Sequence, residues 1–289
     1  SITNGIWRAT LSKHEYIDLM LLQYQPLDNV SDNICKIELL LKKNNVKENT
    51  LVVCPELSLQ RYVCITKTKK NISNAISLDS EEISLIKNIA IKYRIFLCIT
   101  IFEKLKKKYF NTALIINPEG NIIKKYHKKN IPSEICYEES YYFNKSNNGY
   151  QFFSIGVFKI GILICWDQWH SSAYLELKKK DVNLIICPTA IGTCFHKNEK
   201  MQIANEKKKW VNVIEANSLM NNIPVVVANR IGTEQQKDSS IKFWGSSFIT
   251  DAHGTSLKRC KLKQDIIKYR FYKKEQISIK KMWNFKDID

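Results

Sequence analysis

The chain has 289 residues, of which 44% are hydrophobic and 25% are charged, so it can form one large α/β domain and its composition excludes a disordered protein. Its formal net charge of +17 suggests that it could bind nucleic acid or an anionic membrane surface. The lysines are spread along the whole chain, however, and this favours a generally basic surface over a dedicated binding patch. No apolar run approaches the ~20 residues of a membrane-spanning helix, and no signal pattern opens the chain, so we expect a cytoplasmic protein.

Short β-rich runs alternate with amphipathic helical segments, which predicts an α/β fold. In chain order, the predicted elements are a strand over 19–24, a helix over 31–43, a strand over 50–55, a helix over 79–93, strands over 95–102, 112–117 and 159–165, a helix over 173–180, a strand over 183–188, a helix over 203–220, and strands over 224–229, 244–250 and 266–272. Asp79, with Glu82 three residues later, is the predicted N-cap of the second helix. No repeat, linker or boundary interrupts the pattern, so residues 1–289 are predicted to form a single domain.

Nine cysteines are distributed along the chain without a CxxC pair, which argues against a zinc or dithiol redox site. Cys54, Cys98, Cys165 and Cys187 lie in or at the ends of apolar strand-like runs, and we expect them to be buried, reduced thiols. The odd number leaves at least one thiol free in any disulfide scheme.

Two charged residues follow predicted strands and have the chemistry of a hydrolytic site. Glu56 comes directly after a buried strand, where burial raises the pKa of a carboxyl group and suits it to act as a general base. Lys128 ends another strand, before Ile131 and Pro132, and could stabilise a developing oxyanion. Taken alone, each residue has a structural alternative, a capping carboxylate for Glu56 and a surface lysine for Lys128.

Cys165 ends a third apolar run and precedes a predicted sharp turn into a helix. A helix N-terminus lowers the pKa of a thiol and offers backbone N–H groups to an oxyanion, which are the requirements of a nucleophilic cysteine. The alternative is one more buried structural cysteine.

Together these motifs resemble the nitrilase, or carbon–nitrogen hydrolase, superfamily, which uses a Glu–Lys–Cys triad. Pro-Glu ends at Glu56, Tyr-x-Lys-x-x-Ile-Pro contains Lys128, and Cys-Trp-Asp begins at Cys165, in the chain order of the superfamily. The similarity spans about residues 15 to 260. Within the superfamily the chain looks most similar to the N-carbamoylputrescine amidase branch, through segments 141–143, 165–169, 188–192, 229–232 and 243–249.

This resemblance implies a four-layer αββα sandwich that associates into a homo-oligomer and acts on a small amide or ureido compound without a metal or an organic cofactor. It implies catalytic roles for Glu56, Lys128 and Cys165, with Glu139 as a second glutamate that orients the lysine. It also implies that the substrate-binding residues are Asn111, Trp166, Asp167, Thr189 and Ala190. If the substrate is N-carbamoylputrescine, the products are putrescine, ammonia and carbon dioxide.

The chain departs from the branch around the expected pocket. His170-Ser171-Ser172 stands where the branch has Phe-Pro-Glu, and the loop before Glu139 is altered at residues 133–136. A cationic substrate requires acidic groups in the pocket, for which Asp167, Glu138 and Glu234 are candidates. Each could instead form a surface charge or a structural ion pair, for example between Asp167 and Arg230.

Three alternatives remain at this point. The first is another amidase of the superfamily, acting on a carbamoyl amino acid or an ω-amide. The second is a catalytically silent scaffold, against which the presence of all four candidate catalytic residues argues. The third is a nucleic-acid-binding protein, which would bind in a salt-sensitive manner, but no nucleic-acid-binding motif accompanies the charge.

Overall fold

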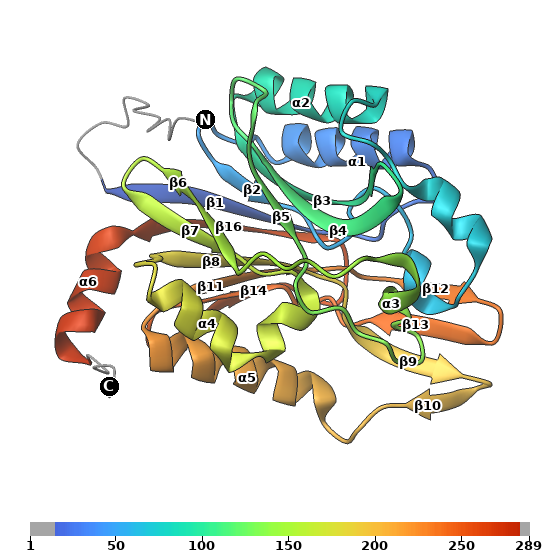
Figure 1. Ribbon diagram of the computed structural model, residues 1–289. Helices are drawn as coiled ribbons and strands as arrows, with labels where there is room; N and C mark the ends of the chain where they lie inside the picture. The colour runs from blue at the N-terminus through green and yellow to red at the C-terminus, as the bar shows by residue number, and fades with distance from the viewer. Residues whose placement is uncertain (1–14, 284–289) are drawn as a thin grey trace.

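Continuous apolar runs form strands that are buried on both faces, and these strands build two sheets packed face to face between two helical layers (Figure 1). The computed structural model describes residues 15–283. The predicted αββα sandwich is confirmed. Among residues 15–283, no helix is both long and apolar enough to cross a membrane.

The first sheet has six strands. Their order across the sheet is β16 (Asp265–Tyr272), β1 (Tyr16–Gln23), β2 (Leu51–Val53), β3 (Phe96–Leu105), β4 (Lys108–Ile116) and β5 (Ile122–His127). Strands β1, β2 and β3 are parallel, and the remaining neighbours are antiparallel. Helices α1 (Val30–Lys43) and α2 (Glu81–Tyr93) cover its outer face with their apolar sides.

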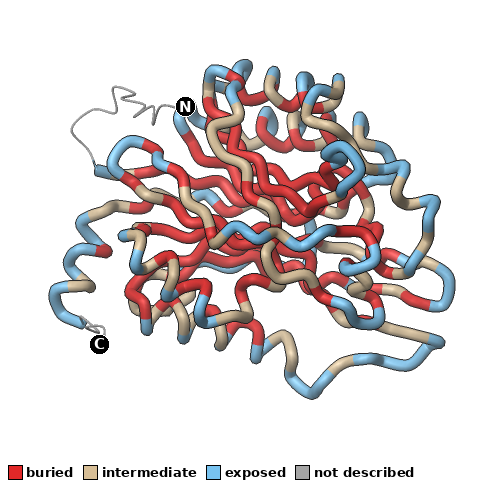
Figure 2. Tube along the Cα trace, in the orientation of Figure 1, coloured by how far each residue is buried: buried red, intermediate tan, exposed pale blue. Residues whose placement is uncertain are grey.

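The second sheet repeats this arrangement, with a parallel centre and antiparallel edges. Its order is β15 (Ser256–Arg259), β14 (Phe248–Thr250), β11 (Val225–Asn229), β8 (Leu184–Thr189), β7 (Phe158–Ile162) and β6 (Gln151–Ile155). Helices α4 (Ser171–Lys178) and α5 (Glu206–Asn221) pack on its outer face. The inner faces of both sheets form one continuous buried core, red through the middle of Figure 2.

A small antiparallel sheet lies beside the sandwich and was not predicted. Its strands, in order across the sheet, are β10 (Glu199–Met201), β9 (Gly192–His196), β13 (Ser239–Phe243) and β12 (Thr233–Gln236). The shorter elements are η1 (Val63–Ile65), η2 (Lys69–Asn74), α3 (Glu139–Tyr142), η3 (Cys165–Trp169) and α6 (Lys273–Met282).

Most predicted elements are confirmed, and the differences at their ends have local causes. Ser80, one residue after the predicted Asp79, is the N-cap of α2, because its side chain accepts a hydrogen bond from the backbone of Ile83 at 3.5 Å. Strand β14 begins only at Phe248, since Gly245 and Ser246 have φ angles of 55° and 53°, which interrupt a strand.

The cysteine prediction is confirmed for Cys54, Cys98, Cys165 and Cys187, all of which are buried and free. A disulfide between Cys136 and Cys194 was not predicted. It links the loop that precedes α3 to strand β9.

Candidate active site

The candidate catalytic residues meet at one edge of the sandwich because of strand direction. Strand β5 runs parallel to β2 and β3, since two antiparallel pairings separate it from β3. Glu56 and Lys128 therefore leave the same edge of the first sheet. Cys165 follows β7 at an edge of the second sheet, and the backbone N–H of Glu56 donates to the carbonyl of Thr189 at 3.3 Å, which joins the two edges. Ligand sites of α/β proteins form at such carboxyl ends.

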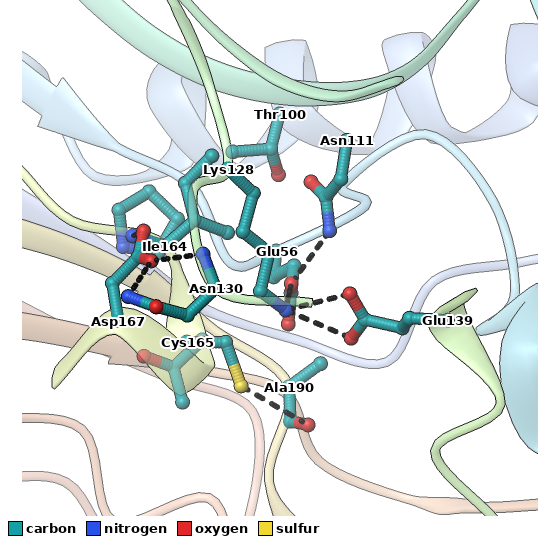
Figure 3. Close-up of polar contacts among 12 residues, drawn as sticks. Glu56, Thr100, Asn111, Lys128, Asn130, Glu139, Ile164, Cys165, Asp167 and Ala190 are labelled. Atoms are coloured by element: carbon teal, nitrogen blue, oxygen red, sulfur yellow. Dashed lines mark hydrogen bonds and ion pairs between the residues drawn. The ribbon is translucent and has the colours of Figure 1, made fainter. Parts of the chain in front are cut away.

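Lys128 is fully buried between two carboxylates. Its Nζ donates to Oε1 of Glu56 at 2.8 Å and to both carboxylate oxygens of Glu139 at 2.7 and 2.8 Å. The hydroxyl of Tyr62 also donates to Glu139, at 2.6 Å, and Nδ2 of Asn111 donates to Glu56 Oε1 at 2.7 Å. These contacts fix the lysine and both carboxylates in one arrangement (Figure 3).

Cys165 lies directly below this group, with its sulfur toward Ala190 (Figure 3). The thiol lies 3.7 Å from the Ala190 carbonyl oxygen. The φ angle of Cys165 is 42°, a strained value for a residue with a side chain, and it ends the extended backbone after Ile164. Strand β7 ends at Ile162, before the predicted end at residue 165, and at Cys165 the chain turns into the 3₁₀ helix η3.

The electrostatics of the group suit proton transfer between Cys165 and Glu56. Burial is the largest effect on Glu56 and raises its pKa to about 7, although the positive charge of Lys128 opposes it. Oε2 of Glu56 has no hydrogen-bond partner within residues 15–283, but the Cys165 thiol lies close enough to lower the pKa of Glu56. The raised pKa of Glu56 agrees with the predicted effect of its burial, and its role as a base stays a prediction.

The pKa of the Cys165 thiol differs from the prediction. Burial and then the charge of Glu56 raise the pKa of Cys165 well above its ordinary value, so the expectation that the following helix lowers this pKa is wrong. Burial lowers the pKa of Lys128, but the charges of Glu139 and Glu56 outweigh it and keep the ammonium protonated. At rest the group therefore holds a neutral thiol beside an ammonium ion.

A pocket of about 610 Å³, including its open mouth, has Cys165 among its lining residues. The lining residues come from the 132–137 loop, η3, the start of β9 and the segment that leads into α5: Pro132, Glu134, Ile135, Tyr137, Cys165, Trp166, Ile191, Gly192, Cys194, Met201 and Glu206. Among them are two carboxylates and no lysine or arginine. Glu134 and Glu206 were not predicted, because one lies in an irregular loop and the other reads as an ordinary first-turn residue of a helix.

The predicted substrate-binding residues occupy different positions. Trp166 lines the pocket, Asn111 contacts Glu56, and the carbonyl of Ala190 faces the Cys165 sulfur. The hydroxyl of Thr189 donates to the carbonyl of Cys187. Asp167 is buried, and its carboxylate accepts hydrogen bonds from the protein itself.

The other predicted acidic candidates are engaged elsewhere. Glu138 pairs with Lys67 at 3.2 Å, near the surface. Glu234 pairs with Arg230 at 2.6 Å and also accepts from the backbone of Tyr62, so the suggested pairing of Asp167 with Arg230 is wrong. None of the three lines the pocket. Within residues 15–283, no group of three or more histidine, cysteine or acidic residues has metal-binding geometry.

Comparisons with known proteins agree on one family. The carbon-nitrogen hydrolase family model matches residues 21–271. A citrullinase of Francisella tularensis is 32% identical over 88% of this chain and 87% of its own length, and an N-carbamoylputrescine amidase of Solanum lycopersicum is 28% identical over 84% and 81%. The crystal structure of a carbon-nitrogen hydrolase from Helicobacter pylori superposes with a TM-score of 0.83 at 27% identity, over 93% and 94% of the two chains.

Proposed function

The chain belongs to the carbon–nitrogen hydrolase family, and we propose that it hydrolyses the ureido group of a small carbamoylated amine, with N-carbamoylputrescine as the first candidate substrate. The observation that carries this proposal is the buried contact of Lys128 with Glu56 and Glu139 beside a pocket-lining cysteine, Cys165. The arrangement provides a base, an oxyanion partner and a nucleophile.

In the proposed first step, Glu56 accepts the proton of the Cys165 thiol and the sulfur attacks the ureido carbonyl carbon. The carbonyl oxygen gains negative charge, which the Lys128 ammonium and the backbone N–H of Trp166 stabilise. Each such donor commonly contributes about 3 kcal/mol to the transition state. The raised pKa of Glu56, about 7, lets it hold this proton near neutral pH.

In the second step, the tetrahedral intermediate collapses, the C–N bond breaks and Glu56 returns the proton to the departing nitrogen. A carbamoyl group then remains on Cys165 as a thiocarbamate. Water, deprotonated by Glu56, attacks its carbonyl carbon, the C–S bond breaks and the sulfur takes the proton back from Glu56. The carbamate that is released decomposes into ammonia and carbon dioxide. With N-carbamoylputrescine the complete reaction yields putrescine, ammonia and carbon dioxide.

Pocket charge supports the carbamoylated amine over the second candidate, citrulline, which the citrullinase similarity suggests. Both compounds carry a ureido group and an ammonium group, but citrulline adds a carboxylate. The pocket lining contains Glu134 and Glu206 and no cationic side chain, so it favours a substrate whose far end is only positive. Burial raises the pKa of Glu206, and the negative charge of Glu134 raises it further, whereas a hydrogen bond with Gln202 and the charges of Lys209 and Lys200 lower it.

The test is ammonia release from N-carbamoylputrescine, citrulline, a carbamoyl-β-amino acid and an ω-amide. We expect turnover of N-carbamoylputrescine by the wild type and a loss of about 10³-fold or more in Cys165→Ala. Cys35→Ala is the matched control, because Cys35 is a free thiol exposed on α1.

Other outcomes would change the proposal in distinct ways. Preferential turnover of another compound would retain the reaction class and change the substrate. Full activity in Cys165→Ala would remove the assigned nucleophile. A folded wild type that hydrolyses none of the four compounds would favour the scaffold alternative.

A further inference from the structure

Resting on the proposed reaction, we infer that Asp167 is a positioning residue whose ionised carboxylate holds the Lys128 segment and the Cys165 turn in fixed register. Lys128 follows β5 at an edge of the first sheet, whereas Cys165 follows β7 in the second sheet. Within the part of the chain that the structure describes, residues 15–283, no strand pairing joins the two sheets. The backbone hydrogen bond from Glu56 to Thr189 links the two edges, and side-chain contacts across the sandwich add to it in setting their relative position at the site.

Asp167 makes such contacts on both sides. Its Oδ2 accepts from the backbone N–H of Ile164 at 3.0 Å and from the hydroxyl of Tyr126 at 2.7 Å. Its Oδ1 accepts from the backbone N–H of Asn130 at 2.8 Å and from the Asn130 side chain at 2.9 Å. Tyr126 and Asn130 flank Lys128 by two residues on either side, and Ile164 directly precedes Cys165. Figure 3 shows Asp167 with Asn130 and Ile164.

The contacts require a carboxylate. Two of the four donors are backbone N–H groups, one on each oxygen, and neither can reverse its role. An asparagine at this position would turn its NH₂ group toward one of them, leaving a buried donor facing another donor. Substitution by asparagine, although nearly isosteric, is therefore not conservative here.

Asp167 acts through other residues and not by contact with substrate. Its side chain is fully buried and does not line the pocket. Loss of the hydrogen bonds of the Asp167 carboxylate would let Lys128 move away from Glu56. The positive charge of Lys128 is what lowers the pKa of Glu56. The apparent pKa of the catalytic base would then rise.

The charged and titratable groups that surround Glu56 come from several elements. They are Lys128, Glu139, Cys165, Cys64, Cys187, Tyr62, Tyr137 and Arg230. Of these, Lys128 opposes the effect of burial most strongly, so its displacement dominates the expected change.

The experiment compares wild type, Asp167→Asn and Glu103→Gln, by kcat and KM against pH and by urea unfolding. Glu103, on β3, is the matched control, since it is also a buried carboxylate and accepts hydrogen bonds from Lys125 and His127 of β5. For Asp167→Asn we expect kcat to fall about 10²-fold, KM to change little and the acidic limb of the profile to move to higher pH. For Glu103→Gln we expect a lower free energy of unfolding and an acidic limb at the same pH as in the wild type.

A second readout does not depend on the substrate. The rate at which iodoacetamide alkylates Cys165, followed by mass spectrometry across pH, should show the same slowing and shift in Asp167→Asn. If the wild type hydrolyses none of the substrates but its Cys165 is alkylated faster than that of Asp167→Asn, with the expected shift in pH, the proposed function is contradicted and the positioning role is supported. If Asp167→Asn does not fold, Tyr126→Phe removes one of the four contacts and should show a smaller effect of the same kind.

The positioning role is overturned if the folded Asp167→Asn variant keeps the acidic limb and the alkylation profile of wild type. It is also overturned if Asp167→Asn and Glu103→Gln lose activity and stability alike without a shift in either profile. If Asp167→Asn does not fold, a Tyr126→Phe variant with the same pH profile and alkylation profile as the wild type also overturns the positioning role.

Discussion

At the scale of single residues, burial decides the chemistry of the site. Glu56, Lys128 and Glu139 have no exposed side-chain surface, so their charges interact strongly and their protonation states depend on one another. Burial raises the pKa of Glu56 and of Cys165, and Lys128 lowers both. In the proposed mechanism the thiol therefore loses its proton by transfer to the adjacent carboxylate and not by ionisation into water.

The first residue-scale prediction concerns pH. Glu56 accepts the thiol proton only as a carboxylate, and its pKa is raised to about 7, so kcat/KM should increase as pH rises through about 7 and level off above it. The measurement is kcat/KM from about pH 4 to 9 with a neutral ω-amide, whose own charge does not change. An acidic limb near pH 4.5, the range of an ordinary glutamate, would contradict the assignment of Glu56 as the base.

The second residue-scale prediction concerns substrate charge. Glu206→Gln should raise KM for N-carbamoylputrescine by about fivefold, which corresponds to about 1 kcal/mol for a partly exposed charge pair. KM for a neutral amide should stay unchanged. Glu199→Gln is the control, because it removes the same charge from an exposed position on β10. Equal KM changes for both substrates would show that Glu206 contributes to the shape of the pocket and does not interact with the charge of the substrate.

At the scale of elements, the pocket is built from segments outside the two main sheets. The loop over residues 132–137 forms one wall, and the beginning of β9, with the segment that leads into α5, forms the other. The Cys136–Cys194 disulfide joins the two walls. Glu134 and Ile135 line the pocket directly beside Cys136, so the position of this wall depends on the link.

The element-scale prediction follows from this link. Reduction of the disulfide should raise KM for N-carbamoylputrescine, because the loop that carries Glu134 gains freedom that substrate binding must remove. The measurement is KM with and without dithiothreitol, for wild type and for Cys136→Ser. The variant should match reduced wild type and should not respond to the reductant. A wild type whose KM is identical under both conditions would show that the disulfide has no role in binding.

At the scale of the whole molecule, the two sheets are held together at the site by buried polar contacts as well as by the apolar core. Arg230 follows β11 in the second sheet and donates to the Gln60 carbonyl at 3.0 Å, in the segment that follows β2 of the first sheet. It also pairs with Glu234, which accepts from the backbone of Tyr62 at 2.6 Å. The segment after Glu56 is thereby tied to the opposite half of the sandwich.

The whole-molecule prediction is that Arg230→Met lowers the free energy of unfolding by about 3–5 kcal/mol, because it leaves the buried Glu234 carboxylate without its partner. Urea unfolding followed by circular dichroism measures the change. Arg259→Met is the control, since its pairing with Glu215 is partly exposed and should contribute less than about 1 kcal/mol. Similar losses of unfolding free energy in both variants would mean that the contacts of Arg230 between the two sheets contribute little to stability.

The net charge of +17 also belongs to the whole molecule, and it opposes the approach of a cationic substrate. The two pocket carboxylates would have to outweigh this field locally. The proposed specificity therefore depends on where a few negative charges lie, and not on the overall composition.

The sequence by itself determined the family and the αββα sandwich. The alternation of apolar runs of strand length with amphipathic helices predicts only an α/β fold, and the sandwich is implied by the family resemblance that three short motifs at the ends of strands carry. It also indicated that Glu56, Lys128, Glu139 and Cys165 belong together, although their catalytic roles remain predictions. The small sheet was missed because its strands are short and mostly polar, and such strands have weak periodicity.

Only the tertiary structure decided which charges face the pocket and which support the fold. Asp167 and Glu234 looked like ligands for a cation, but both are buried among protein donors, whereas Glu134 and Glu206 line the pocket. The φ angle of Cys165 and the direction of its pKa shift were equally out of reach. The physical reason is that burial and charge proximity arise between segments far apart in the chain, and no local pattern of residues encodes them.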